Sequence, residues 1–96
     1  MLTWITYDIT CNKTRRKIAI LCLRLGLYRV QKSIYLGKIK KKHLKRFKEE
    51  VQQLMNPKTD SVFIIPTTTQ DFKKIIQYGQ SFDQRKVAGK IKIVII

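Results

Sequence analysis

Long apolar runs, a basic leader and multidomain length are all missing from this sequence. No segment approaches the roughly 18 to 20 apolar residues that a membrane-spanning helix needs. No basic residues precede the first apolar stretch, as they would in a signal peptide. We therefore expect one globular domain in the 96 residues, with no membrane span and a cytoplasmic location.

Residues that bind metals through sulfur or imidazole are also scarce, with two cysteines and one histidine. Cys11 and Cys22 show no CxxC spacing, and His43 alone cannot complete a zinc site. Cys22 falls on the apolar face of a predicted helix, so we expect it to be a small core residue. The cysteines therefore indicate neither a disulfide nor zinc.

Acidic residues are few: 6 Asp and Glu stand against 21 Lys and Arg, which gives a net charge of +15. Such an excess repels itself in the folded state, and a polyanionic partner relieves that repulsion by releasing its counterions. Nucleic acid is the first candidate, an anionic membrane surface is the second, and a merely solvated basic face is the third. Recurrent strand patterns count against a membrane-lying helix.

The hydrophobic pattern predicts seven elements in the order strand, helix, extended segment, helix, strand, short helix, strand. They cover residues 2–9, a helix from a cap at Thr10 or Asn12 to about Leu25, then 27–39, 40–55, 60–66, 70–78 and 90–96. Gly26 is expected to end the first helix and Gly37 to mark a bulge or bend. Residues 60–66 read as a buried strand, and residues 80–89 as a polar linker.

If residues 27–39 form two strands, the first six elements make an α+β fold, a ferredoxin-like βαββαβ sandwich with helices on one sheet face. Strand 2–9 carries apolar side chains on both faces, so the second face also needs a cover. A second copy of the sheet is the simplest cover and predicts a two-fold homodimer. Within this single domain, residues 1–79 form the nucleic-acid-binding core, and 80–96 the linker and terminal strand.

Asp8 stands at the end of the first predicted strand, in the stretch Tyr7 to Thr10. It can act as a charge near the helix N-terminus or as a partner for Arg15 or Arg16. It can also bind Mg²⁺, which prefers oxygen ligands and often uses one or two protein carboxylates. A two-fold axis would supply the second copy of Asp8.

Basic residues cluster in the first turns of the first helix, where they oppose the helix dipole unless an anion is bound, and along one face of the second helix, which suits broad contact with a phosphate backbone. We expect phosphate contacts from Arg15, Arg16 and Lys17 in the first helix, and from Lys40, Lys41, Lys42, Lys45 and Arg46 in and before the second. His43 has no visible carboxylate to orient it, and Ser33 and the threonines 67–69 lack partners for nucleophilic catalysis.

Four motifs, in order and spacing, resemble one known family: "YDIT", "TRRKIA", "GLYRVQKSIYLG" and "DSVFIIP". Together they are similar to the small CRISPR-associated endoribonucleases, the non-integrase subunit of the spacer-acquisition complex. The similarity extends piecewise from Trp4 to Gly79.

The resemblance implies a homodimer in which a C-terminal strand pairs across the dimer. It implies a catalytic Mg²⁺, or another divalent cation, on Asp8 near the two-fold axis, with Tyr7, Arg15, Arg29 and Tyr35 as supporting residues. It also implies an integrase partner and substrates that are double-stranded DNA or RNA.

Two hypotheses for function follow. The first is a metal-dependent endonuclease that acts through Asp8. The second is a non-catalytic subunit that bridges DNA, because many relatives carry further acidic residues soon after the strand-one aspartate whereas "TCNKTRRK" has none. An RNA-binding module is a weaker third, because Trp4 and Tyr7 point to opposite faces of the predicted strand.

Overall fold

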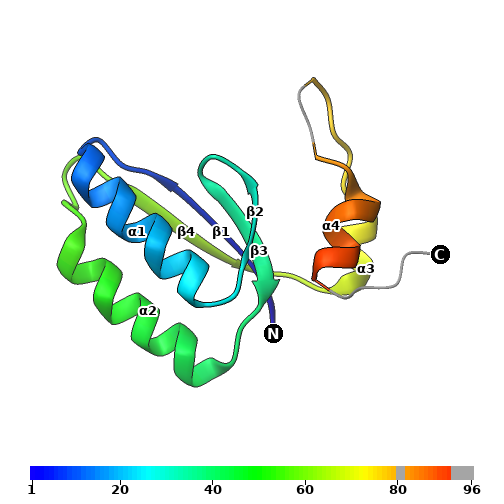
Figure 1. Cartoon of the computed structure of the whole chain (residues 1–96), viewed down its shortest axis with the longest axis horizontal. Helices are drawn as coiled ribbons and strands as arrows, with labels where there is room; N and C mark the ends of the chain where they lie inside the picture. The colour runs from blue at the N-terminus through cyan, green and yellow to red at the C-terminus, as the bar shows by residue number, and fades with distance from the viewer. Residues whose placement is uncertain (80–81, 92–96) are drawn as a thin grey trace.

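The computed structural model describes residues 1–79 and 82–91 (Figure 1). The described elements are β1 (Leu2–Asp8), α1 (Asn12–Arg24), β2 (Tyr28–Gln31), β3 (Ile34–Lys38), α2 (Lys41–Leu54), β4 (Ser61–Pro66), α3 (Thr69–Lys73) and α4 (Gln84–Lys90). The first six follow the predicted order βαββαβ, and the segment 27–39 forms two strands. No helix in the described residues is long and apolar enough to cross a membrane.

The four strands form one antiparallel sheet in the order β2-β3-β1-β4, so β1 is central. In its register Ile5 pairs with Tyr35 of β3 and with Ile64 of β4, and Asp8 pairs with Ser61. Side chains alternate between faces along β1 as predicted. Ile5 and Tyr7 lie in one hydrophobic cluster, whereas Leu2 and Trp4 belong to another.

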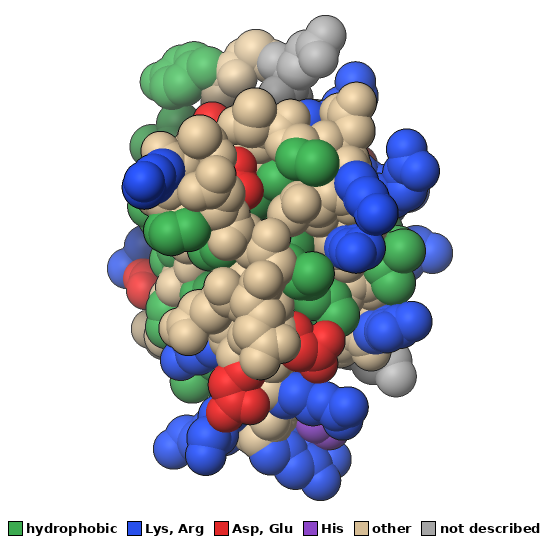
Figure 2. Space-filling model, turned by 90° about the vertical axis from the view of Figure 1, so that its left-hand side faces the viewer, with side chains coloured by type: hydrophobic (Ala, Val, Ile, Leu, Met, Phe, Trp, Pro, Cys, Tyr) green, Lys and Arg blue, Asp and Glu red, His purple; other side chains and the backbone are tan. Residues whose placement is uncertain are grey.

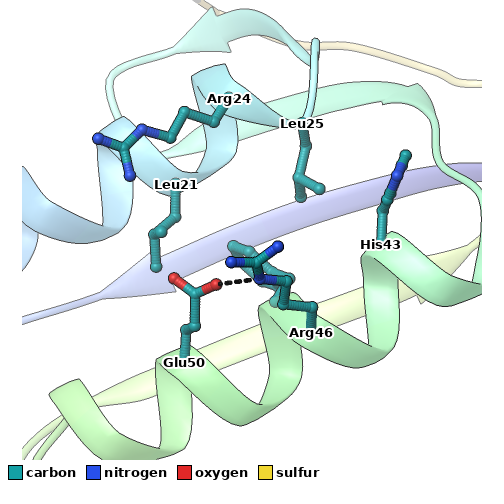
Figure 3. Close-up of a pocket in the computed structure, with 7 residues that line it drawn as sticks. Leu21, Arg24, Leu25, His43, Arg46 and Glu50 are labelled. Carbon is teal, nitrogen blue, oxygen red and sulfur yellow. Dashed lines mark ion pairs between the residues drawn. The ribbon is translucent and has the colours of Figure 1, made fainter.

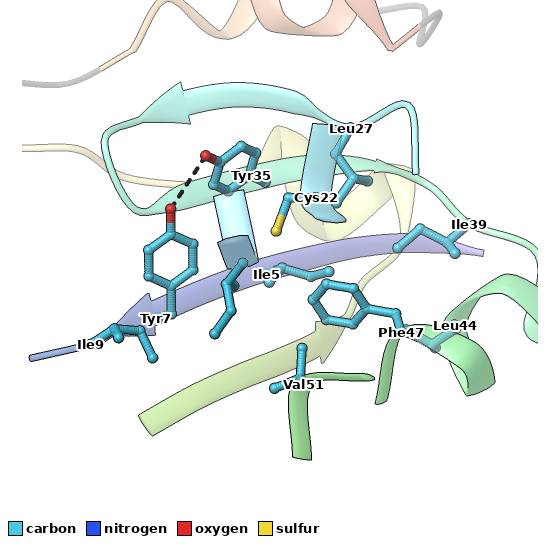
Figure 4. Packing of buried hydrophobic residues seen from close by; sticks show 11 residues of the cluster. Ile5, Tyr7, Ile9, Cys22, Leu27, Tyr35, Ile39, Leu44, Phe47 and Val51 are labelled. Carbon is cyan, nitrogen blue, oxygen red and sulfur yellow. Dashed lines mark hydrogen bonds between the residues drawn. The ribbon is translucent and has the colours of Figure 1, made fainter. Parts of the chain in front are cut away.

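The first cluster lies between the sheet and the helices α1 and α2 (Figure 4). Its buried members are Ile5, Tyr7, Ile9, Ile18, Cys22, Leu27, Tyr35, Ile39, Leu44, Phe47 and Val51. The prediction that Cys22 is a core residue is confirmed, and burial raises the pKa of its thiol to about 12.

The ends of α1 differ in how well the sequence predicted them. The N-cap is Cys11, with no side-chain hydrogen bond, so the expected cap at Thr10 or Asn12 is wrong. The end at Gly26 is confirmed: Gly26 has φ of 80°, its amide donates to Leu23, and the amide of Leu27 donates to Cys22. These two bonds form a Schellman motif, which favours glycine at the left-handed position.

The second cluster lies on the opposite face of the sheet, under α3 and α4, and comprises the buried residues Leu2, Leu36, Phe72, Val87, Ala88 and Ile91. The prediction of a polar linker over residues 80–89 is wrong for the part that the structure describes, because α4 occupies residues 84–90. Asp83 caps α4 by accepting from the amides of Arg85 and Lys86. The chain itself covers part of the face that a second copy was expected to cover.

Four further expectations need correction. The strand β4 is not buried, because it lies at the sheet edge and Phe63 is 57% exposed. Gly37 pairs regularly with Thr3, and the irregularity lies between Arg29 and Gln31 instead.

The helix expected over 70–78 ends earlier, because α3 covers Thr69–Lys73. The expected strand at 90–96 fails at its first two residues, since Lys90 ends α4 and Ile91 is its C-cap. Residues 92–96 of that strand lie outside the described part of the chain.

Candidate metal and nucleic-acid site

Asp8 is exposed at the end of β1, and its side chain points to the sheet face opposite α1 and α2. Among the residues that the structure describes, its carboxylate makes no hydrogen bond or ion pair. The expected pairing with Arg15 or Arg16 is therefore wrong, and with Cys11 as the N-cap Asp8 lies outside α1. Both oxygens of Asp8 are available to a ligand.

Arg15 holds the loop that follows Asp8. Its Nε donates to the carbonyl of Ile9 at 3.1 Å, and its Nη2 donates to the carbonyl of Thr10 at 3.2 Å. These are charge-assisted bonds to two of the three residues that join β1 to α1. Arg15 therefore positions the backbone beside Asp8 and does not contact the carboxylate.

Asp60 anchors the same loop from the other side, a role that the sequence analysis missed. Its Oδ1 accepts from the amide of Thr10 at 3.0 Å, and its Oδ2 accepts from the amide of Asn56 at 2.9 Å. The bonds from Asn56 and then Thr10 lower the pKa of Asp60. The polar run "NPKTD" before β4 was the available signal, since aspartate often accepts from nearby backbone amides in turns.

Tyr7, Tyr35 and Arg29 come together on the other side of the sheet, beneath α1. The two tyrosine rings stack with centroids 5.9 Å apart, and their hydroxyls are 3.3 Å apart (Figure 4). The Arg29 guanidinium lies 5.5 Å from the centre of the Tyr35 ring. Burial raises the pKa of Tyr35, and its hydrogen bond with Tyr7 raises it further, so its hydroxyl stays protonated at neutral pH.

This tyrosine and arginine group holds the turn between β2 and β3. The carbonyl of Lys32 accepts from the Tyr7 hydroxyl at 3.4 Å, and from Nε and Nη2 of Arg29 at 3.1 and 2.6 Å. Tyr7 and Tyr35 are at most 5% exposed. The predicted residues thus separate into two sets: Asp8 on one sheet face, with Arg15 behind its loop, and Tyr7, Arg29 and Tyr35 on the other.

The predicted phosphate-binding residues are all at the surface. Arg15, Arg16 and Lys17 are exposed on α1, and Lys40, Lys41, Lys42, Lys45 and Arg46 are exposed on α2 or at its N-cap. Neither helix has an acidic residue in its first turn. Basic side chains project from several margins of the molecule in Figure 2, which favours broad contact with a polyanion.

An exposed apolar surface lies beside Asp8 on the same face of the sheet. Phe63 pairs with Thr6 and Ile65 with Trp4, and these two β4 side chains are 57% and 46% exposed. A cavity of about 500 Å³ lies on the same face; its lining includes Trp4, Thr6, Ile34, Ile65, Ile75 and Phe82. Exposed apolar patches of this kind often mark an interaction surface.

The donor set at Asp8 fits half of a magnesium site. Within residues 1–79 and 82–91 no three His, Cys, Asp or Glu side chains are grouped to hold a metal. One free carboxylate, with the hydroxyl residue Ser61 opposite it in β4, supplies the hard oxygen donors that Mg²⁺ accepts. Mg²⁺ usually completes its shell with water and phosphate oxygens.

This fold, a four-stranded antiparallel sheet with two basic helices and an exposed aspartate closing its central strand, matches that of a family of small CRISPR proteins. The sequence profile described as CRISPR associated protein Cas2 matches residues 1–75. The chain belongs to the Cas2 family.

Two relatives carry names that state an activity. The CRISPR-associated endoribonuclease Cas2 of Korarchaeum cryptofilum is 29% identical over 76 residues, which is 79% of this chain and 82% of that protein. The CRISPR-associated endoribonuclease Cas2 2 of Chloroflexus aurantiacus is 27% identical over 81 residues, covering 82% and 93%.

Solved structures give the same fold. The crystal structure of Streptococcus pyogenes Cas2 at pH 6.5 superposes with a TM-score of 0.71 at 25% identity, over 82% of this chain and all of that one. A hypothetical protein from Thermus thermophilus superposes with a TM-score of 0.65 at 27% identity, over 70% and 80%. Family membership therefore rests on both sequence and fold.

Proposed function

We propose that this Cas2-family protein acts in CRISPR adaptation as a homodimer of ferredoxin-like protomers, and that it cleaves RNA or double-stranded DNA with Mg²⁺ bound at Asp8. The observation that carries the proposal is the position of Asp8. Its carboxylate is exposed, has no partner in the described residues, and shares its sheet face with Phe63 and Ile65. The relatives named endoribonucleases support nuclease chemistry in the family.

The homodimer would bury the apolar surface of β4 and bring a second Asp8 into the same region. The exposed side chains of Phe63 and Ile65 lose contact with water in such a contact, and burial of this kind drives association. The two Asp8 carboxylates would then hold one Mg²⁺ with water and substrate oxygens. When bound, Mg²⁺ polarises the scissile phosphodiester and activates a water molecule.

The remaining predicted residues have supporting roles in this proposal. Arg15 fixes the loop after Asp8, and the exposed cations of α1 and α2 attract the polynucleotide backbone. Tyr7, Arg29 and Tyr35 act as positioning residues, since they hold the β2–β3 turn from the sheet face opposite Asp8.

The decisive experiment substitutes Asp8→Ala and measures cleavage of single-stranded RNA and duplex DNA with Mg²⁺ and with EDTA. We expect cleavage by the wild type with Mg²⁺ and none by Asp8→Ala, with the dimer intact by light scattering. Asp71→Ala is the matched control, because Asp71 is an exposed aspartate on α3. Equal activity of the wild type and Asp8→Ala would remove Asp8 from the mechanism.

A second candidate function is a non-catalytic subunit that bridges DNA for an integrase partner. The net charge of +15 and the solitary position of Asp8 in the described residues favour it. It predicts tight duplex binding that weakens steeply with salt. The logarithm of the binding constant should fall with the logarithm of the salt concentration, with a slope near −0.9 for each phosphate neutralised. Binding without any cleaved product, and unaffected by Asp8→Ala, would favour this function over the nuclease.

A further inference from the structure

A groove between α1 and α2 forms a cavity of about 300 Å³, on the helical side of the sheet and therefore opposite Asp8 (Figure 3). Its lining residues are Leu21, Arg24, Leu25, His43, Arg46, Phe47 and Glu50. The half-buried Leu21 of α1, its half-buried C-cap Leu25 and the buried Phe47 of α2 supply an apolar floor. A ligand here would rest an apolar surface on this floor.

Hydrogen-bond donors reach the groove from both helices. Arg24 comes from the last turn of α1, and His43 and Arg46 come from α2. Figure 3 shows Arg46 directed from α2 into the gap toward α1. In the described part of the chain, the side chains of Arg24 and His43 have no hydrogen bond or ion pair, so their donors are available to an anion.

One acceptor stands among these donors. Oε1 of Glu50 is 3.3 Å from Nε of Arg46, in an ion pair that spans one turn of α2. This pair leaves the two terminal nitrogens of Arg46 available to an anion, and it leaves Oε2 of Glu50 available to a donor. The groove therefore offers an anion site, an apolar floor and a hydrogen-bond acceptor side by side.

We propose that this groove binds a pyrimidine or purine nucleotide, with its phosphate between Arg24 and Arg46, its base on the floor of Leu21, Leu25 and Phe47, and an amino group of the base donating to Glu50. A nucleotide carries an anion, a flat apolar ring and an N–H donor in one small molecule. Inorganic phosphate would leave the floor and Glu50 unused. The volume lies at the small end of the range for ligand pockets.

This site is separate from the proposed nuclease site, because it lies on the other side of the sheet and uses neither Asp8 nor magnesium. The nucleotide can be a free monophosphate or the terminal residue of a strand with a 5′-phosphate. Both share the same chemistry, and the experiment below separates them.

The test is a titration of the uniformly ¹⁵N-labelled full chain, followed by amide chemical shifts. The probes are cytidine monophosphate, uridine monophosphate, cytidine, inorganic phosphate and a 5′-phosphorylated oligonucleotide of deoxycytidine. We expect cytidine monophosphate to shift amides of α1 and α2 on both sides of the groove. We expect it to bind more tightly than cytidine or phosphate.

Base selectivity tests the role of Glu50. Cytosine presents an amino donor where uracil presents a carbonyl acceptor, so wild type should prefer cytidine monophosphate by about fivefold. In Glu50→Ala this preference should fall to near one, while affinity for inorganic phosphate rises because Arg46 is released from its ion pair.

Charge removal tests the phosphate site. Arg24→Gln should weaken cytidine monophosphate binding by about tenfold, as the loss of a charge-assisted hydrogen bond predicts. Arg85→Gln, which removes the same charge from the exposed surface of α4, should leave the affinity unchanged. Unperturbed amides elsewhere in the spectrum verify that each variant is folded.

The results decide the proposal as follows. Tighter binding of the monophosphate assigns the groove to a free nucleotide, and tighter binding of the oligonucleotide, with the same groove amides shifted, assigns it to a strand end. Three results would each overturn the proposal. They are groove amides that do not shift, equal affinities for the cytidine and uridine monophosphates, and equal losses of cytidine monophosphate affinity in Arg24→Gln and Arg85→Gln.

Discussion

The two faces of the sheet differ in how completely this chain covers them. Beneath α1 and α2 the side chains of Ile5, Tyr35 and Phe47 are at most 3% exposed. On the opposite face α3 and α4 cover β2, β3 and the start of β1, and Phe63 and Ile65 of β4 remain exposed beside Asp8. The helical face has its core complete in one chain, whereas the Asp8 face retains surface for a partner.

Alternation along β1 gives the two faces different chemistry. Tyr7 and Asp8 are neighbours in sequence, yet the first is sealed in the core and the second is open to solvent. Motif proximity therefore does not imply a shared site. Tyr7 stabilises the sheet from one face, and Asp8 offers its carboxylate on the other.

The largest expected effect comes from a matched pair of phenylalanine substitutions, one for each face. Phe47→Ala empties a position that is 3% exposed and should lower the free energy of unfolding by about 3 to 5 kcal/mol. Phe63→Ala removes an exposed ring and should change the stability of the protomer by less than about 0.5 kcal/mol. Both changes in the free energy of unfolding are measured by urea unfolding. The protein concentration is one at which light scattering shows a monomer.

The same pair separates protomer stability from association. At concentrations where the wild type is dimeric, Phe63→Ala should lower the apparent stability and the dimer fraction together, because association stabilises the folded state by mass action. A Phe63→Ala protein that dimerises as well as wild type would show that the β4 surface is not the contact.

A smaller effect is expected at Gly37, where β3 approaches Leu27. A Cβ at this position would lie 2.8 Å from Cδ2 and 3.3 Å from Cα of Leu27, and Leu27 is buried in the first cluster. Gly37→Ala should therefore cost about 1 to 3 kcal/mol, as overpacking of a core does. Urea unfolding measures the change. A decrease in the free energy of unfolding much smaller than this range would mean that Leu27 can move aside.

Substitution of Gly89 tests how much α4 contributes to covering the second face of the sheet, and it should increase the stability of the protein. It lies within α4, and no atom lies within 4 Å of the position that a Cβ would occupy. Gly89→Ala should stabilise by about 0.5 to 1 kcal/mol, because glycine loses more backbone entropy in a helix. Thermal unfolding should show a higher Tm, and an unchanged Tm would indicate that α4 adds little to the cover.

The sequence predicted the parts of this fold that local patterns determine. Alternation on β1, the helical stripe of α2 and the stop at Gly26 were readable because each depends on residues within a few positions. The helix α4 was missed because its seven residues bury just Val87 and Ala88, and their packing against Phe72 is a contact that periodicity does not reveal. The exposure of β4 was missed for a similar reason, since an apolar edge strand resembles a central one.

The candidate site was predictable in part. Asp8 and the basic residues were found from their residue types and position on the chain. The separation of Asp8 from Tyr35 required the register between β1 and β3, and the role of Asp60 required the approach of the loop before β4 to the loop after β1. The first contact pairs Ile5 with Tyr35 and the second joins Thr10 to Asp60, so both lie beyond the reach of any local pattern.

The smallest effect on stability is expected at Asp60, which joins the loop after β1 to the loop before β4. Its lowered pKa means that the folded state favours the carboxylate, so its contribution to stability is present above the ordinary pKa of about 4. That contribution is lost as pH falls through the lowered pKa. In Asp60→Asn the side chain has one acceptor oxygen for the amides of Thr10 and Asn56, and it does not titrate.

Urea unfolding at pH 7 and at pH 3 measures this difference. Wild type should be more stable than Asp60→Asn at pH 7. The difference in stability should narrow toward pH 3, because the Asp60 carboxylate takes up a proton first in the unfolded chain, while the lowered pKa keeps it charged in the folded protein. Asp71→Asn is the control, because that carboxylate is exposed and makes no hydrogen bond in the described residues. A gap that stays constant between the two pH values would show that Asp60 holds the loop by shape alone, without its charge.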